Sequence, residues 1–230
     1  MSDLLCIATI ALAGLAQATL QMNLGGLILL YQASMGKHYR RKTRHLARSY
    51  ILGTCAICFL AICACGYLIP TIFGARLSVE QLVILVGILM GGALVMWLLY
   101  YRKGQNTELW IPRSFAQFII KRAKNTDDSI EAFSLGTLSS LAELPLSLML
   151  CVVAANAILG LDINYQLPAI AAYIVIVAVP MLCLKFRIRT GSNVIAAQKW
   201  RIKNKAFARI ISGSSFMALG LFVLAFWVIK

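Results

Sequence analysis

Six long apolar runs constrain what this chain of 230 residues can fold into. An α-helix needs roughly 20 apolar residues to cross a bilayer, and each run approaches or exceeds that length. Apolar residues make up 60% of the chain and charged residues 13%, against about 45–50% and about 25% in soluble domains. This excludes a soluble enzyme, a disordered chain and a secreted disulfide scaffold. It predicts an all-α integral membrane protein with six transmembrane helices, at Leu4–Met35, Tyr50–Phe73, Leu82–Tyr101, Ile130–Ile158, Leu167–Leu184 and Ile210–Ile229.

The basic residues are concentrated on one side of this predicted membrane protein. Twenty of the 22 Lys and Arg residues lie within 36–48, 102–129 and 185–209, the loops that follow the first, third and fifth runs. The positive-inside rule makes that side cytoplasmic and leaves both termini outside, in the inner (plasma) membrane. We expect these loops to contact anionic lipids and no nucleic acid. Within 102–129, apolar residues at helical spacing from Ile111 to Ile119 predict a short interfacial helix.

The first and fourth runs share two unusual features. Each is too long for a simple crossing, since Leu4–Met35 would measure about 48 Å as one helix against a hydrocarbon core about 30 Å thick. Each also carries polar residues near its middle. With an offset of 122 positions, Gly14, Gln17, Gln21 and Gly25 align with Gly136, Ser139, Glu143 and Ser147, and the spacing puts each set on one helix face.

Residues that weaken a helix stand at equivalent depth in the same two runs. We expect Gly25-Gly26 in the first run and Pro145 in the fourth to break or hinge their helices. The chain then divides into two three-helix repeats, 1–101 and 130–230, joined by the cytoplasmic loop 102–129. Because three is odd, the second repeat is inverted in the membrane relative to the first, as in many secondary transporters.

Glu143 is the acidic residue placed deep in a run, where an unpaired charge is expensive. It would bind a proton, a cation or a substrate ammonium group at a midplane site between the first and fourth helices. The alternative is a hydrogen-bonded glutamate that joins helices, with Gln21 as its partner. Neutral polar residues would line the site, although small polar residues also simply permit close helix packing; they are Gln17, Gln21, Asn23, Ser139 and Ser147.

The cysteines of the second run are a weaker signal. Cys55-Ala-Ile-Cys58 has the spacing of a redox or metal motif, but the run is rich in Gly, Ala and Cys, which favours helix packing. The sequence contains no HExxH motif, phosphate-binding glycine loop or paired carboxylates at useful spacing. We therefore expect no enzyme activity, no cofactor and no metal site.

The run Ala142-Glu143-Leu144-Pro145, within the inverted-repeat pattern, resembles the fourth-span signature of the glycolipid-addressing (GAP) branch of the lysine exporter (LysE) superfamily. The resemblance implies export of a small polar solute or movement of a lipid-linked envelope component. Other branches place a Cys or an Asp at this depth in both repeats, where this chain has Gln21 and Glu143. That departure weakens both thiol-disulfide exchange and metal export.

These observations together predict a secondary transporter or exporter of the inner membrane. Two alternatives stay open: a non-transporting subunit that docks a cytoplasmic partner through its basic loops, and an intramembrane thiol-disulfide electron carrier. A homo-oligomer is compatible with all three.

Overall fold

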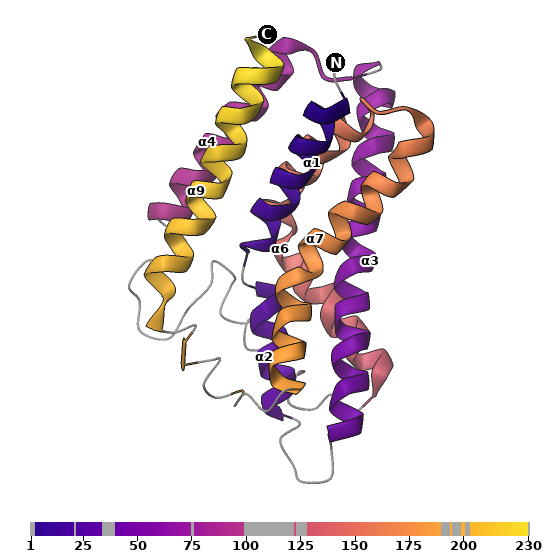
Figure 1. Ribbon diagram of the computed structural model, residues 1–230, viewed down its shortest axis with the longest axis vertical. Helices are drawn as coiled ribbons and strands as arrows, with labels where there is room; N and C mark the ends of the chain where they lie inside the picture. Colours follow the sequence, from indigo (N-terminus) through magenta and orange to yellow (C-terminus); the bar gives the residue numbers. More distant parts are fainter. Residues whose placement is uncertain are drawn as a thin grey trace.

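The computed structural model describes residues 3–20, 22–33, 40–74, 76–98, 122, 128–189, 194, 199–200 and 203–229 (Figure 1). All regular structure in these segments is helical. The elements are α1 (Asp3–Ala18), α2 (Met22–Ala33), α3 (Arg40–Phe73), α4 (Val79–Leu98), α6 (Ser129–Ile158), α7 (Ile163–Arg189), α9 (Lys205–Val223) and a π-helical end, η1 (Leu224–Val228).

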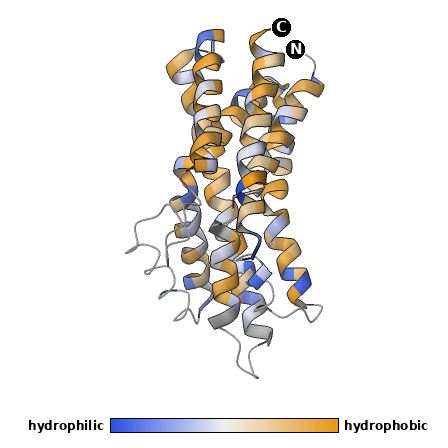
Figure 2. Ribbon diagram, turned by 90° about the vertical axis from the view of Figure 1, so that its left-hand side faces the viewer, coloured by the Kyte–Doolittle hydropathy of each residue, from blue (hydrophilic) through white to orange (hydrophobic). Residues whose placement is uncertain are grey.

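Five of these helices are long and apolar enough to cross a membrane: α3, α4, α6, α7 and α9 with η1. They coincide with the second to sixth predicted runs, so the helices expected there are confirmed. Large apolar side chains cover the outside of the bundle, as Leu60, Ile84 and Val175 illustrate with about half or more of their surface exposed. Figure 2 shows hydrophobic residues along most of the bundle's length. A multi-pass membrane protein is the fold that this surface fits.

The first predicted run forms two helices, which follow one another along the long axis (Figure 1). The break lies between Ala18 and Met22, so the expectation that Gly25 and Gly26 interrupt the helix is wrong: both lie inside α2. Gly26 instead leaves room for the side chain of Tyr50, because a Cβ at position 26 would collide with the Tyr50 hydroxyl group. The helix α6 is also continuous across Pro145, from Ser129 to Ile158, so there is no break at that residue, and a hinge at Gly25-Gly26 or at Pro145 stays a prediction. Proline supplies no backbone N–H, so one hydrogen bond of the helical ladder is missing at Pro145.

The most buried of the five membrane-length helices is α6, with 61% of its apolar stretch buried against 22–39% in the other four. It contacts α1, α2, α3, α4 and α7. Its tightest neighbour is α3, where Gly53 lies on the backbone at Phe133 and Gly136 lies on the backbone at Tyr50. The two glycines let the α3 and α6 backbones touch, which places the polar residues of α6 in the interior.

The helices α4 and α9 form a pair beside this core, next to α1 in Figure 1. Small residues bring them together: Gly92 packs against Phe216, and Gly220 packs against Met90. The pair is joined to the core through α1, which contacts α9, and through α6, which contacts α4.

The chain termini lie at one end of the bundle, and the N-terminal ends of α3, α6 and α9 lie at the other (Figure 1). At the termini end, the α3–α4 connection is held to α6. The Leu77 amide donates to Asn156 Oδ1 at 3.1 Å, and Arg76 Nη2 donates to the Leu159 carbonyl at 3.2 Å. The predicted interfacial helix of 102–129 lies outside the described residues, apart from Arg122 and the start of α6.

Candidate functional site

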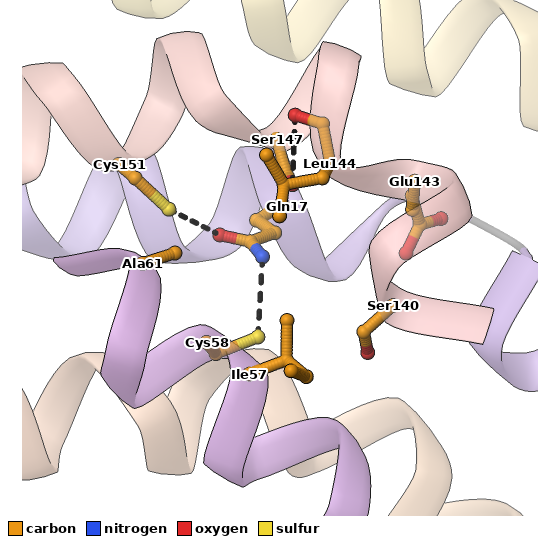
Figure 3. Close-up of a pocket in the computed structure, with 9 residues that line it drawn as sticks. All are labelled: Gln17, Ile57, Cys58, Ala61, Ser140, Glu143, Leu144, Ser147 and Cys151. Atoms are coloured by element: carbon orange, nitrogen blue, oxygen red, sulfur yellow. Dashed lines mark hydrogen bonds between the residues drawn. The ribbon is translucent and has the colours of Figure 1, made fainter. Parts of the chain in front are cut away.

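A small internal cavity lies where α1, α3 and α6 meet, and Figure 3 shows the side chains around it. Its volume is about 10 Å³, which is the space that one water molecule needs. Six of the nine lining residues have polar or sulfur-bearing side chains; the full lining is Gln17, Ile57, Cys58, Ala61, Ser140, Glu143, Leu144, Ser147 and Cys151.

Gln17 is the centre of the hydrogen bonds around this cavity. Its Nε2 donates to Cys58 Sγ on α3 at 3.4 Å, and its Oε1 accepts from Cys151 Sγ on α6 at 3.9 Å. The same oxygen accepts from the hydroxyl of Tyr173, which is completely buried on α7. One carboxamide therefore joins four helices, each of which brings one polar group to the same point.

Glu143 faces the cavity from α6 and is 4% exposed. Ser140 and Ser147 lie about one helical turn before and after it and line the same space. The described lining contains no basic residue. A buried carboxyl group can hold a proton or bind a cation, because either neutralises its charge.

The structure brings together three of the predicted site residues, Gln17, Glu143 and Ser147, at one cavity. Ser139 is buried, but it lies toward Gly26 and is not part of the cavity lining. Gln21 lies outside the described residues. The backbone of Asn23 belongs to α2, and its side chain lies outside the described part.

Sequence reasoning missed the three partners of Gln17, which are Cys58, Cys151 and Tyr173. A signal for Tyr173 existed, because a tyrosine in the middle of an apolar span needs a partner for its hydroxyl. Cys58 belongs to a CxxC pattern, but the small residues around it favour helix packing over a polar contact. Cys151 gave no signal of its own in a run of small apolar residues.

A second polar cluster surrounds the break between α1 and α2. The Thr19 hydroxyl donates to the Ala16 carbonyl at 2.6 Å, and the Ser212 hydroxyl of α9 donates to the Thr19 carbonyl at 3.1 Å. The hydroxyl oxygens of Thr19 and Ser215 are 3.2 Å apart. The Ser212 side chain of α9 thus provides a donor for the Thr19 carbonyl at the break, as the interior of a membrane protein requires.

Comparisons of the chain with protein-family models, curated proteins and solved structures found no match. Within the described segments, no three His, Cys, Asp or Glu residues are arranged to hold a metal ion.

Proposed function

We propose that this chain is a secondary membrane transporter whose site is the cavity between α1 and α6, with Glu143 as its proton or cation site. The observation that carries the proposal is the convergence of Glu143, Gln17 and Ser147 on one internal space beside a broken first span. Polar groups in the interior of a membrane bundle and discontinuous helices are typical of transport sites. In this proposal α1 and α2 together form the first of six spans.

The helix contacts support two inverted repeats. In two repeats, α1 would correspond to α6, α3 to α7, and α4 to α9. A contact between α1 and α7 should then have a counterpart between α6 and α3. In the same way, the α1–α9 contact should have a counterpart between α6 and α4. The contacts α1–α6, α3–α7 and α4–α9 each join two corresponding helices, so each is its own counterpart. All seven of these contacts are present.

Individual residues show the same correspondence. Gly14 on α1 packs against the side chains of Ile176 and Tyr173 on α7, and its counterpart Gly136 on α6 lies on the backbone of Tyr50 on α3. Both tyrosines are completely buried. In each half, a glycine of the first span thus lies against the second span of the other half.

The cavity holds about one water, so this arrangement is a closed state of the proposed transporter. A solute would enter only when the halves move apart at α1 and α6. The cytoplasmic side would be the end with the basic loops, and both termini would lie outside. The substrate classes that we propose, a small polar solute or a lipid-linked envelope component, come from the resemblance to the LysE superfamily.

A thermal-stability screen of purified protein tests this function. Wild type would be scanned with amino acids, divalent metals and lipid-linked sugars, beside Glu143→Gln and the control Glu131→Gln, which removes a half-exposed carboxylate near the start of α6. A ligand at about 100 times its Kd stabilises by roughly 2.7 kcal/mol, or about 5–10 °C in Tm.

We expect one substrate class to raise Tm in wild type and in Glu131→Gln but not in Glu143→Gln. Uptake of that compound into proteoliposomes should show the same pattern. A Tm shift that survives in Glu143→Gln, or the failure of every class to raise Tm, contradicts the proposal.

The thiols favour one second candidate, an intramembrane thiol-disulfide carrier. Cys58 from the first half and Cys151 from the second contact the same Gln17 side chain. Two thiols there would reduce a partner's disulfide to a dithiol, passing on two electrons and two protons and forming a Cys58–Cys151 disulfide. Gln17 would have to withdraw first, because its amide lies between the two sulfur atoms (Figure 3).

Mild oxidation tests this candidate. Diamide treatment followed by mass spectrometry should find a Cys58–Cys151 linked peptide in wild type and increase its yield in Gln17→Ala. The control is Cys183, an exposed thiol on α7 that should alkylate freely in both proteins. Linkage that is absent in Gln17→Ala eliminates the carrier function.

A further inference from the structure

Two completely buried tyrosines, Tyr50 on α3 and Tyr173 on α7, lie in opposite halves of the bundle. Each follows the start of its helix by about three turns. The helix α3 begins at the end with the basic residues, whereas α7 begins at the end with the chain termini (Figure 1). Tyr50 is therefore nearer the basic end and Tyr173 is nearer the termini.

The side chain of Tyr173 closes the termini side of the cavity. Its hydroxyl donates to Gln17 and lies 3.9 Å from Cys151 Sγ, and both of these residues line the cavity. Its ring lies against Gly14, where a Cβ would be 3.4 Å from the ring carbon Cδ2. Gly14 is about one turn nearer the termini than Gln17, so the ring separates the cavity from the termini end.

The side chain of Tyr50 lies on the other side of the cavity. A Cβ built on Gly26 of α2 would collide with the Tyr50 hydroxyl and would lie 3.4 Å from Ser139 Oγ. Ser139 directly precedes Ser140, which is the lining residue of α6 nearest the basic end. On α3, Tyr50 is about two turns nearer the basic end than the lining residue Cys58. Tyr50 thus separates the cavity from the basic end.

We propose that Tyr173 and Tyr50 are the two gates of the transport pathway, Tyr173 toward the termini side and Tyr50 toward the side of the basic loops. The inference rests on the proposed function and deepens it, because it names the barriers on either side of the Glu143 cavity. Each gate belongs to the second span of a different half. When the halves move, one tyrosine can withdraw while the other stays in place, as alternating access requires.

The thiol of Cys58 is a native reporter for both gates, because it lines the cavity between them and its residue is 3% exposed. Right-side-out and inside-out membrane vesicles, with orientation established by protease access to a C-terminal tag, would be treated with a charged, impermeant methanethiosulfonate. Mass spectrometry then measures labelled Cys58.

Tyr173→Ala should speed labelling about tenfold from the termini side alone, and Tyr50→Ala should do so from the opposite side alone, since loss of a ring shifts the population toward one open state. The matched controls are Tyr165→Ala on α7 and Tyr67→Ala on α3. Both remove an exposed tyrosine from the same helix as a gate and should label like wild type.

The side from which labelling increases separates gating from general damage, because a loosened bundle would expose Cys58 from both sides. Tyr173→Leu and Tyr50→Leu keep part of the apolar volume and provide a second pair, for which the same sided increase is expected. Equal labelling from both sides, or an unchanged rate in both the alanine and the leucine variants, overturns the gates.

The labelling requires no substrate, so it is independent of the ligand screen at Glu143. Sided labelling beside a failed ligand screen would support the two barriers and reject the substrate site. Unsided labelling beside a successful ligand screen would reject the gates and leave the transport site standing.

Discussion

The glycine contact between α3 and α6 allows a quantitative prediction about stability. A Cβ placed on Gly53 would lie 3.1 Å from the carbonyl carbon of Phe133 and 3.2 Å from the amide nitrogen of Thr137, with the Phe133 oxygen closer still. These neighbours are backbone atoms of α6, so they cannot rotate away. The Gly53→Ala substitution must therefore push two whole helices apart.

The expected loss of stability is the difference between two opposing contributions. Overpacking of this kind costs about 3 kcal/mol at the upper end of its usual range. The alanine gains about 1 kcal/mol in helix propensity over glycine. The net loss of about 2 kcal/mol corresponds to a fall in Tm of about 4–8 °C for a chain of this size.

Gly66 on the same helix is the matched control. A Cβ there has nothing within 4 Å, so Gly66→Ala should keep the Tm of wild type or raise it slightly. Thermal unfolding in detergent, followed by intrinsic fluorescence or by dye labelling of buried thiols, measures both variants. If Gly53→Ala and Gly66→Ala melt at the same temperature, the close α3–α6 approach is refuted.

Two further substitutions test other polar contacts. Gln17→Leu should lower the stability by about 1–3 kcal/mol because it leaves the buried Tyr173 hydroxyl without its acceptor; adding Tyr173→Phe should recover part of the loss, and additive Tm changes in this double-mutant cycle would argue against the contact. Asn156→Ala should cost about 1–2 kcal/mol, since it removes the acceptor of the Leu77 amide; hydrogen exchange at Leu77 should accelerate with it, and unchanged exchange would contradict that bond.

The positions of the membrane helices follow from the sequence because apolar length alone decides them. The second to sixth runs each became one helix, with ends that moved by a few residues where amphipathic turns such as Arg40–Ser49 extend the helix beyond the apolar part. Local propensity misplaced the break in the first span. Gly25 and Gly26 weaken a helix in isolation, but the contacts of Thr19 with Ser212 and Ser215 depend on α9, almost 200 residues later.

In the candidate site, too, the residues that stand out within their own segment could be predicted, whereas their partners from other helices could not. Gln17, Glu143 and Ser147 could be predicted because each is polar in an apolar span and repeats at helical spacing. Their partners could not be predicted, since Cys58 and Tyr173 reach Gln17 only through the crossing of α3 and α7 over α1. The angle and depth of such crossings are set by close contacts such as Gly14 on Tyr173, which no single segment specifies.

The pairing of α4 with α9 has a consequence for the order in which the protein is made. Leu98 ends α4 and Lys205 begins α9, so at about 5–20 residues per second α4 waits roughly 5–20 s for its main partner during synthesis. Throughout that time the surface of α4 at Gly92, which packs against Phe216 in the folded protein, faces lipid or an insertion chaperone. Nascent chains stalled before α9 should therefore be the species most exposed to membrane quality-control proteases.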